Sequence, residues 1–151
     1  MLSPTRRPLA GFFVAPMRGC LRTVSMKLLL IVAGGAAGSL LRYLVQGWSQ
    51  ALTSGSFPLG TLVVNVIGCF LVGALNCLFT DLWPIRAEYR VGLLVGLLGG
   101  FTTFSTFGWE TFILANDGQW LRAGLNVLLS VSLGLGAVWL GYRLAEQLYG
   151  V

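Results

Sequence analysis

Four long apolar stretches separated by short polar connections dominate the chain. They run over about Lys27–Gln46, Phe57–Phe79, Val91–Leu114 and Leu121–Ala145. Each is close to the roughly 20 residues that a helix needs to cross the hydrocarbon core of a bilayer. Charged residues are absent from positions 43–80, 91–109 and 123–142. The pattern therefore predicts an all-α integral membrane protein with four transmembrane helices per subunit.

The composition supports this class. The chain is 56% hydrophobic and 10% charged, with a mean hydropathy of +0.80, whereas soluble domains are about 25% charged. This excludes an ordinary soluble enzyme and a nucleic-acid binder, despite a pI near 9.6. The chain has no His, and its three Cys residues form no CxxC pair. These features argue against an enzyme and against a zinc or iron–sulfur site.

The first 25 residues differ from the rest. They contain four arginines and no acidic residue. We expect residues 1–25 to be a basic tail, either an overlong gene start or a disordered segment, and residues 26–151 to form the membrane domain. Without the tail, Lys and Arg divide four to two between the two sides of the membrane; with it, eight to two. The larger bias would fix both termini in the cytoplasm.

The third stretch contains an unusual segment, Gly99-GFTTFST-Phe107. Paired glycines and clustered β-branched residues weaken a helix. We expect this helix to break in mid-membrane, where its carbonyl groups would face a bound ion or a cavity. An intact helix, with hydroxyls bonded to carbonyls four residues earlier, is the alternative.

Candidate anion-binding groups lie in and near this segment. Phe104 and Phe107 share a helix face, and aromatic rings have a positive edge. Thr61 and Asn65 share a face of the second stretch, and an Asn amide can donate hydrogen bonds. The alternative for the Phe pair is a lipid-facing or core-packing role, and the alternative for Asn65 is hydrogen bonding between helices. The fourth stretch adds further polar side chains: Asn126, Ser130 and Ser132.

Charged side chains near the membrane are few. Arg42 lies near the end of the first stretch and Glu110 near the end of the third, so neither is expected at the midplane. A small proton-coupled four-helix exporter would need a buried carboxylate, and Lys27–Gln46 contains none. A non-transporting assembly subunit is a further alternative.

Glycines recur at GxxxG spacing, as Gly34 with Gly38 and Gly92 with Gly96. Such spacing lets two helices approach closely. The approach could occur inside one bundle, but the small size of the chain favours an interface between subunits.

The sequence resembles the Fluc fluoride channels, also called the CrcB family, from about Met26 to the C-terminus. The matching segments are Gly34-GAAGSLLR-Tyr43, Pro58-LGTLVVNVIGCFLVG-Ala74, Gly99-GFTTFST-Phe107 with Glu110 after it, and Leu125-Asn126-Val127. Gly108 stands where the family often has Ser.

The resemblance implies an antiparallel, dual-topology homodimer in the plasma (inner) membrane of a prokaryote. Two pores per dimer would carry fluoride passively out of the cytoplasm, and a structural sodium ion would lie on the dimer axis. An antiparallel dimer needs insertion in both orientations, which the tail opposes. We therefore expect translation to begin at Met26, or the tail to be removed.

The resemblance also assigns roles to residues. Backbone carbonyls of Gly99 and Thr102 would hold sodium. Arg42 and Glu110 would line a vestibule. The fluoride pore would be lined by Asn65, Phe104, Phe107, Ser105, Thr106, Thr61 and Ser130.

Overall fold

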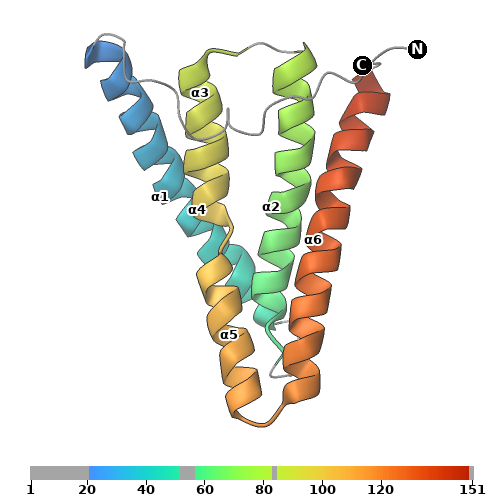
Figure 1. The fold of residues 1–151 in the computed structure, drawn as a ribbon. Coiled ribbons are helices and arrows are strands. Elements are labelled where there is room, and N and C mark those ends of the chain that lie inside the picture. Colours follow the sequence, from blue (N-terminus) through green and yellow to red (C-terminus); the bar gives the residue numbers. More distant parts are fainter. Residues whose placement is uncertain (1–20, 52–56, 83–84, 150–151) are drawn as a thin grey trace.

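The chain forms a bundle of long helices (Figure 1). The computed structural model describes residues 21–51, 57–82 and 85–149. The elements in chain order are α1 (Leu21–Ala51), α2 (Leu59–Cys77), η2 (Leu78–Leu82), α3 (Ala87–Val91), η3 (Gly92–Leu98), α4 (Gly99–Phe101), α5 (Phe104–Asn116) and α6 (Trp120–Tyr149). In these residues, four helical stretches are long and apolar enough to cross a membrane. This confirms the predicted all-helical membrane fold.

The helices extend beyond the apolar stretches. The first stretch was predicted at Lys27–Gln46, whereas α1 runs over Leu21–Ala51 and has 31 residues. At 1.5 Å per residue such a helix is about 46 Å long, against about 30 Å of hydrocarbon. The apolar pattern marks only the part that matches the hydrocarbon. Residue 26, the predicted start of the membrane domain, lies inside α1, and the first 20 residues of the predicted tail lie outside the described residues.

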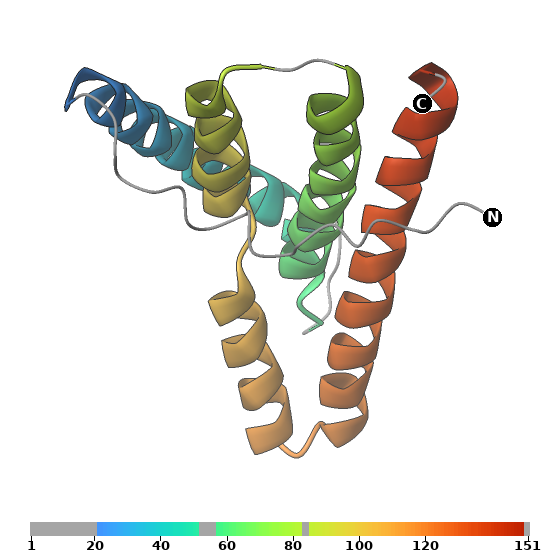
Figure 2. The same cartoon turned by 45° about the horizontal axis from the view of Figure 1, so that its top comes forward.

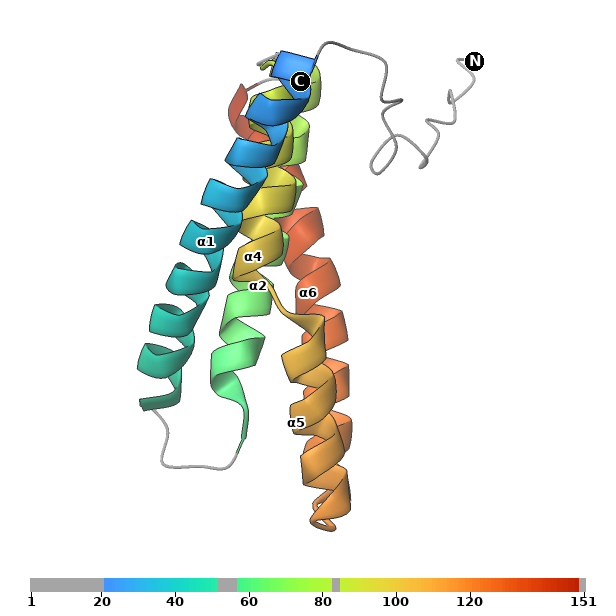
Figure 3. The ribbon, with the colours of Figure 1, turned by 90° about the vertical axis from the view of Figure 1, so that its left-hand side faces the viewer.

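Two close helix pairs organise the bundle. α1 packs against η3, and α2 packs along α6. The start of α1 and the end of α6 lie at the same end of the bundle, and the tight turn between α5 and α6 lies at the other (Figure 1). Gly118 in that turn has a φ of +74°, which favours glycine. Beyond the link that follows α4, α5 lies beside α6 and diverges from α1 (Figures 2 and 3).

The glycines at GxxxG spacing join α1 to η3 within the chain. A Cβ atom on Gly34 would lie 2.6 Å from the carbonyl oxygen of Gly92, and one on Gly38 would collide with the backbone of Leu97. A Cβ atom on Gly100 would likewise lie 2.6 Å from the carbonyl oxygen of Gly35. The interpretation that these glycines form an interface between subunits is therefore wrong. They allow two backbones of one subunit to touch.

Candidate functional site

The third of the four long helical stretches, Ala87–Asn116, is interrupted at two residues between α4 and α5. Thr102 has φ −83° and ψ 158°, and Thr103 has φ −150° and ψ 116°. Both values are those of extended chain rather than helix. The ribbon accordingly narrows to a short link between α4 and α5 (Figure 3).

Asn65 on α2 pairs with the extended backbone of Thr103. Its Nδ2 donates to the Thr103 carbonyl oxygen across 3.0 Å, and its Oδ1 accepts from the Thr103 amide across 2.8 Å. Thr103 is only 6% exposed. The Asn65 side chain therefore satisfies both the amide and the carbonyl of Thr103, a buried residue outside the helix. An adjacent strand would satisfy them in the same way.

The last carbonyl groups before this interruption lose their helical donors, and those of Gly99 and Thr102 are two of them. In a continuous helix the amides of Thr103 and Thr106 would donate to the carbonyls of Gly99 and Thr102. Here the Thr103 amide donates to Asn65. The Thr106 amide donates to Oγ1 of Thr103 across 3.3 Å, so Thr103 is the N-cap of α5. The carbonyls that the resemblance assigns to a cation are thus among those withdrawn from helical bonding.

Arg42 also reaches the interruption. Its Nη1 lies 3.4 Å from the Thr102 carbonyl oxygen, to which it donates. Arg42 as a whole is half-buried, and its guanidinium joins α1 to the extended link. A positive group therefore already lies beside one of the two carbonyls, and it is not among the residues that line the cavity described below.

Hydroxyl and aromatic groups gather at the start of α5. Oγ1 of Thr103 lies 3.3 Å from Oγ of Ser105 and 3.0 Å from Oγ1 of Thr106. The rings of Phe104 and Phe107 are 5.4 Å apart and tilted by 49°. Phe104 is 83% exposed, whereas Phe107 is half-buried. Donors and ring edges thus lie together, with one ring facing outward.

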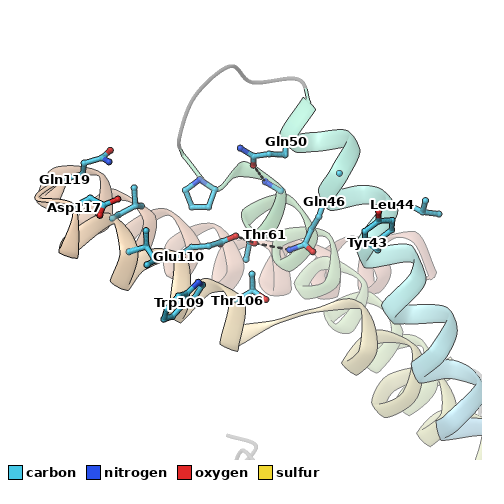
Figure 4. Close-up of a pocket in the computed structure, with 15 residues that line it drawn as sticks. Tyr43, Leu44, Gln46, Gln50, Thr61, Thr106, Trp109, Glu110, Asp117 and Gln119 are labelled. Carbon is cyan, nitrogen blue, oxygen red and sulfur yellow. Dashed lines mark hydrogen bonds between the residues drawn. The ribbon is translucent and has the colours of Figure 1, made fainter.

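A cavity of about 730 Å³ opens between α1, the start of α2 and α5 (Figure 4). Glu110 lies on its wall, where Oε1 accepts a hydrogen bond from Thr61 across 2.7 Å. The other oxygen, Oε2, is buried and has no hydrogen-bond partner among the described residues. Predicted residues Thr61, Thr106 and Glu110 line this cavity. Glu110 therefore lines a cavity, and its role in a vestibule stays a prediction.

Two glutamines at the cavity were missed by sequence reasoning. Gln46 donates to Thr61 across 3.0 Å. Gln50 accepts from the Gly60 amide across 3.3 Å and donates to the Phe57 carbonyl across 3.3 Å, which satisfies the start of α2. Both follow Arg42 on α1 in steps of four residues. That spacing of polar residues in an apolar helix was the available signal.

The two buried polar residues of α6 differ in their contacts. Asn126 is 2% exposed and donates to Thr111, which donates to the Phe107 carbonyl. The hydroxyl of Ser130 is buried without a partner in the part of the chain that the structure describes. No hydrogen bond joins Ser130 to the predicted pore residues of α2 or α5 among the described residues.

Comparison with known proteins identifies relatives of the chain. A family model described as "CrcB-like protein, Camphor Resistance (CrcB)" matches residues 29–142. The fluoride-specific ion channel FluC of Geobacter metallireducens is 46% identical over 123 residues, which cover 82% of this chain and 99% of that protein. FluC of Geobacter sulfurreducens is 49% identical over 121 residues, covering 80% and 98%. FluC of Solibacter usitatus is 46% identical over 122 residues, covering 81% and 100%.

Proposed function

The chain belongs to the CrcB family, and we infer that it is a fluoride-selective ion channel embedded in a membrane. It is not an enzyme. The observation that carries this function is the likeness to fluoride-specific channels over nearly their whole length. That likeness includes the segment in which Asn65 pairs with an interrupted helix. We propose further that the flow is passive and that it exports fluoride from the cytoplasm.

The proposed fluoride path runs past the start of α5. The Asn65 amide retains a second hydrogen beyond the one given to Thr103, and Ser105 and Thr106 add hydroxyl donors. Phe104 and Phe107 offer the positive edges of their rings. Thr61 would extend the path towards the cavity, and Ser130 is proposed as a further lining residue on α6. We propose that this interruption is the break expected in mid-membrane.

We propose that the channel is an antiparallel, dual-topology homodimer with two pores, in the inner membrane of a prokaryote. Phe104 is 83% exposed on the single chain, so one wall of the path is open. Large apolar side chains are also exposed along α1, α5 and α6, among them Leu40, Phe112, Leu135 and Trp139. Such faces suit lipid or a second subunit. The near-balanced charge of the membrane domain is compatible with insertion in both orientations.

A structural sodium ion is proposed at the Gly99 and Thr102 carbonyls. Their donor chemistry fits it, because unwound backbone carbonyls are known sodium ligands in membrane proteins. The fit also rests on the loss of the helical donors to these carbonyls. The Thr103 amide donates to Asn65, and the Thr106 amide donates to the Thr103 side chain. When bound, the ion would neutralise the carbonyl dipoles. The side chains of Asn65 and Thr103 keep the Thr103 and Thr106 amides away from those carbonyls.

Fluoride efflux from liposomes containing the purified protein tests the function. A fluoride electrode records release after valinomycin is added to potassium-loaded vesicles, and chloride release is recorded in parallel. We expect rapid fluoride release without chloride release. Absence of fluoride release from well-folded, reconstituted protein would contradict the function. Replacing sodium with N-methylglucamine on both sides should then slow the flow, and an unchanged rate would contradict the sodium proposal.

A further inference from the structure

Three hydrogen-bonded side chains cross the cavity wall from α1 through α2 to α5 (Figure 4). Nε2 of Gln46 donates to Thr61 across 3.0 Å, and the Thr61 hydroxyl donates to Oε1 of Glu110 across 2.7 Å. All three side chains line the cavity. Thr61 is buried, and Gln46 and Glu110 are half-buried. The hydrogen bonds are therefore partly shielded from water, where their strength is greater than in bulk solvent.

The chemistry of the three groups fixes the direction of the hydrogen bonds. A Thr hydroxyl has one proton to donate, and an ionised carboxylate only accepts. The Gln46 amide donates to the Thr61 oxygen, so the single Thr61 proton is directed to Glu110. Without the Gln46 donor, the hydroxyl would be free to rotate to the carbonyl of Phe57 or Pro58, just before α2. Glu110 would then lose the hydrogen bond that holds Oε1.

We propose that Gln46 is a positioning residue, which acts through Thr61 to hold the Glu110 carboxylate against the cavity wall and out of the fluoride path. This inference rests on the proposed channel function. Because Oε2 has no hydrogen-bond partner in the described chain, the bond from Thr61 anchors the carboxylate. A released carboxylate would swing into a cavity whose lining is mostly but not wholly apolar, where a negative charge repels fluoride more strongly than in bulk water.

Fluoride efflux from liposomes tests the proposal with two variants of Gln46. Gln46→Met keeps the length of the side chain but donates no hydrogen bond. Gln46→Glu keeps its shape but competes with Glu110 for the Thr61 proton. We expect each variant to conduct about tenfold more slowly than wild type, the scale of one lost hydrogen bond to a charged group. Wild-type flux through Gln46→Met would overturn the proposal.

Gln50→Glu is the matched control for added charge. Gln50 lines the same cavity one helical turn along α1, but it bonds to the backbone at the start of α2. The variant places the same negative charge in the same cavity without touching Thr61. We expect a smaller loss than in Gln46→Glu. Equal losses would show that charge alone acts, and would overturn the positioning role.

Two background variants separate positioning from packing. In Thr61→Val the middle group is absent, so Gln46→Met should cause no further loss of flux. In Glu110→Gln the introduced amide can donate to Thr61, which can then donate to a carboxylate at position 46. Gln46→Glu should therefore cause no loss in this background, or should raise the flux. The same fold-loss in every background would show a merely structural role and overturn the proposal.

Thermal unfolding of the same purified variants in detergent provides a readout that needs no conduction. We expect the destabilisation caused by Gln46→Met and Glu110→Gln to be non-additive, and the coupling to vanish in Thr61→Val. Additive effects would contradict the hydrogen-bonded connection from Gln46 through Thr61 to Glu110. If the wild type releases no fluoride but this coupling is present, the channel function fails while the connection between the three residues stands.

Discussion

Replacing Asn65 with Leu should remove the pairing that holds the extended link. The variant keeps a side chain of similar size on α2 but offers neither donor nor acceptor to Thr103. Both backbone groups of Thr103, which is 6% exposed, then lose their partner. The helical acceptor for the Thr103 amide is the Gly99 carbonyl. A return to that bond would extend the helix and withdraw one of the released oxygens.

The size of the effect follows from the two hydrogen bonds. Interhelical hydrogen bonds in membrane proteins average about 0.6 kcal/mol and reach about 1.7 kcal/mol. Two bonds of 3.0 Å and 2.8 Å to a buried residue therefore give a loss of about 1–3 kcal/mol. The upper end applies if the Thr103 groups stay unpaired, because an unsatisfied buried group adds its own penalty.

Reversible unfolding in mixed detergent micelles measures this loss, and hydrogen–deuterium exchange of residues 99–107 reports on the Thr103 amide. Asn76→Leu is the matched control on the same helix, where the side chain accepts one long bond of 3.3 Å from Arg90 and donates to its own helix. We expect Asn65→Leu to destabilise more than the control and to abolish most fluoride flux. A loss under about 0.5 kcal/mol with unchanged exchange and flux would refute the pairing as the cause of the interruption.

Three further predictions follow from the packing and the site. Phe107→Ile should leave the protein folded and its oligomeric state unchanged but impair fluoride efflux, because it keeps bulk and removes the ring edge; full wild-type efflux would refute the ring-edge role. Gly38→Ala should destabilise by about 2 kcal/mol or more in detergent unfolding, since its Cβ meets the Leu97 backbone, whereas Gly47→Ala, with open space, should not. Intact-mass analysis of natively expressed protein should show a chain without residues 1–25, because translation begins at Met26 or the tail is removed, and active protein that retains these residues would contradict this.

The apolar pattern predicted the number and class of the helices because each passage must present about 20 apolar residues to lipid. It did not predict their ends, since interfacial turns carry no such pattern. It was also wrong about the GxxxG glycines. Spacing shows that two helices can approach closely, but not whether the second helix belongs to the same chain. Here Gly38 faces Leu97 of its own subunit.

The site was predicted unevenly for a similar reason. Gly99, Gly100 and the β-branched pair indicated a weak helix, and the resemblance indicated which residues matter. Neither indicated that Asn65 pairs with Thr103, or that Gln46 meets Thr61, because these contacts depend on how three helices are rotated against one another. The roles of the pore residues, the sodium ion and the dimer stay predictions.

At the extended link, the atoms that would bind a cation and the atoms that keep them free of helical hydrogen bonds belong to different residues and different parts of the chain. The two oxygens of Gly99 and Thr102 belong to the main chain, so a change of side chain at position 102 leaves them present. The groups that divert their helical donors are side chains, on Asn65 and Thr103. Mutations that damage this proposed cation site would therefore fall mainly on side chains that do not contact the cation. A comparison of the ligand residues alone would miss them.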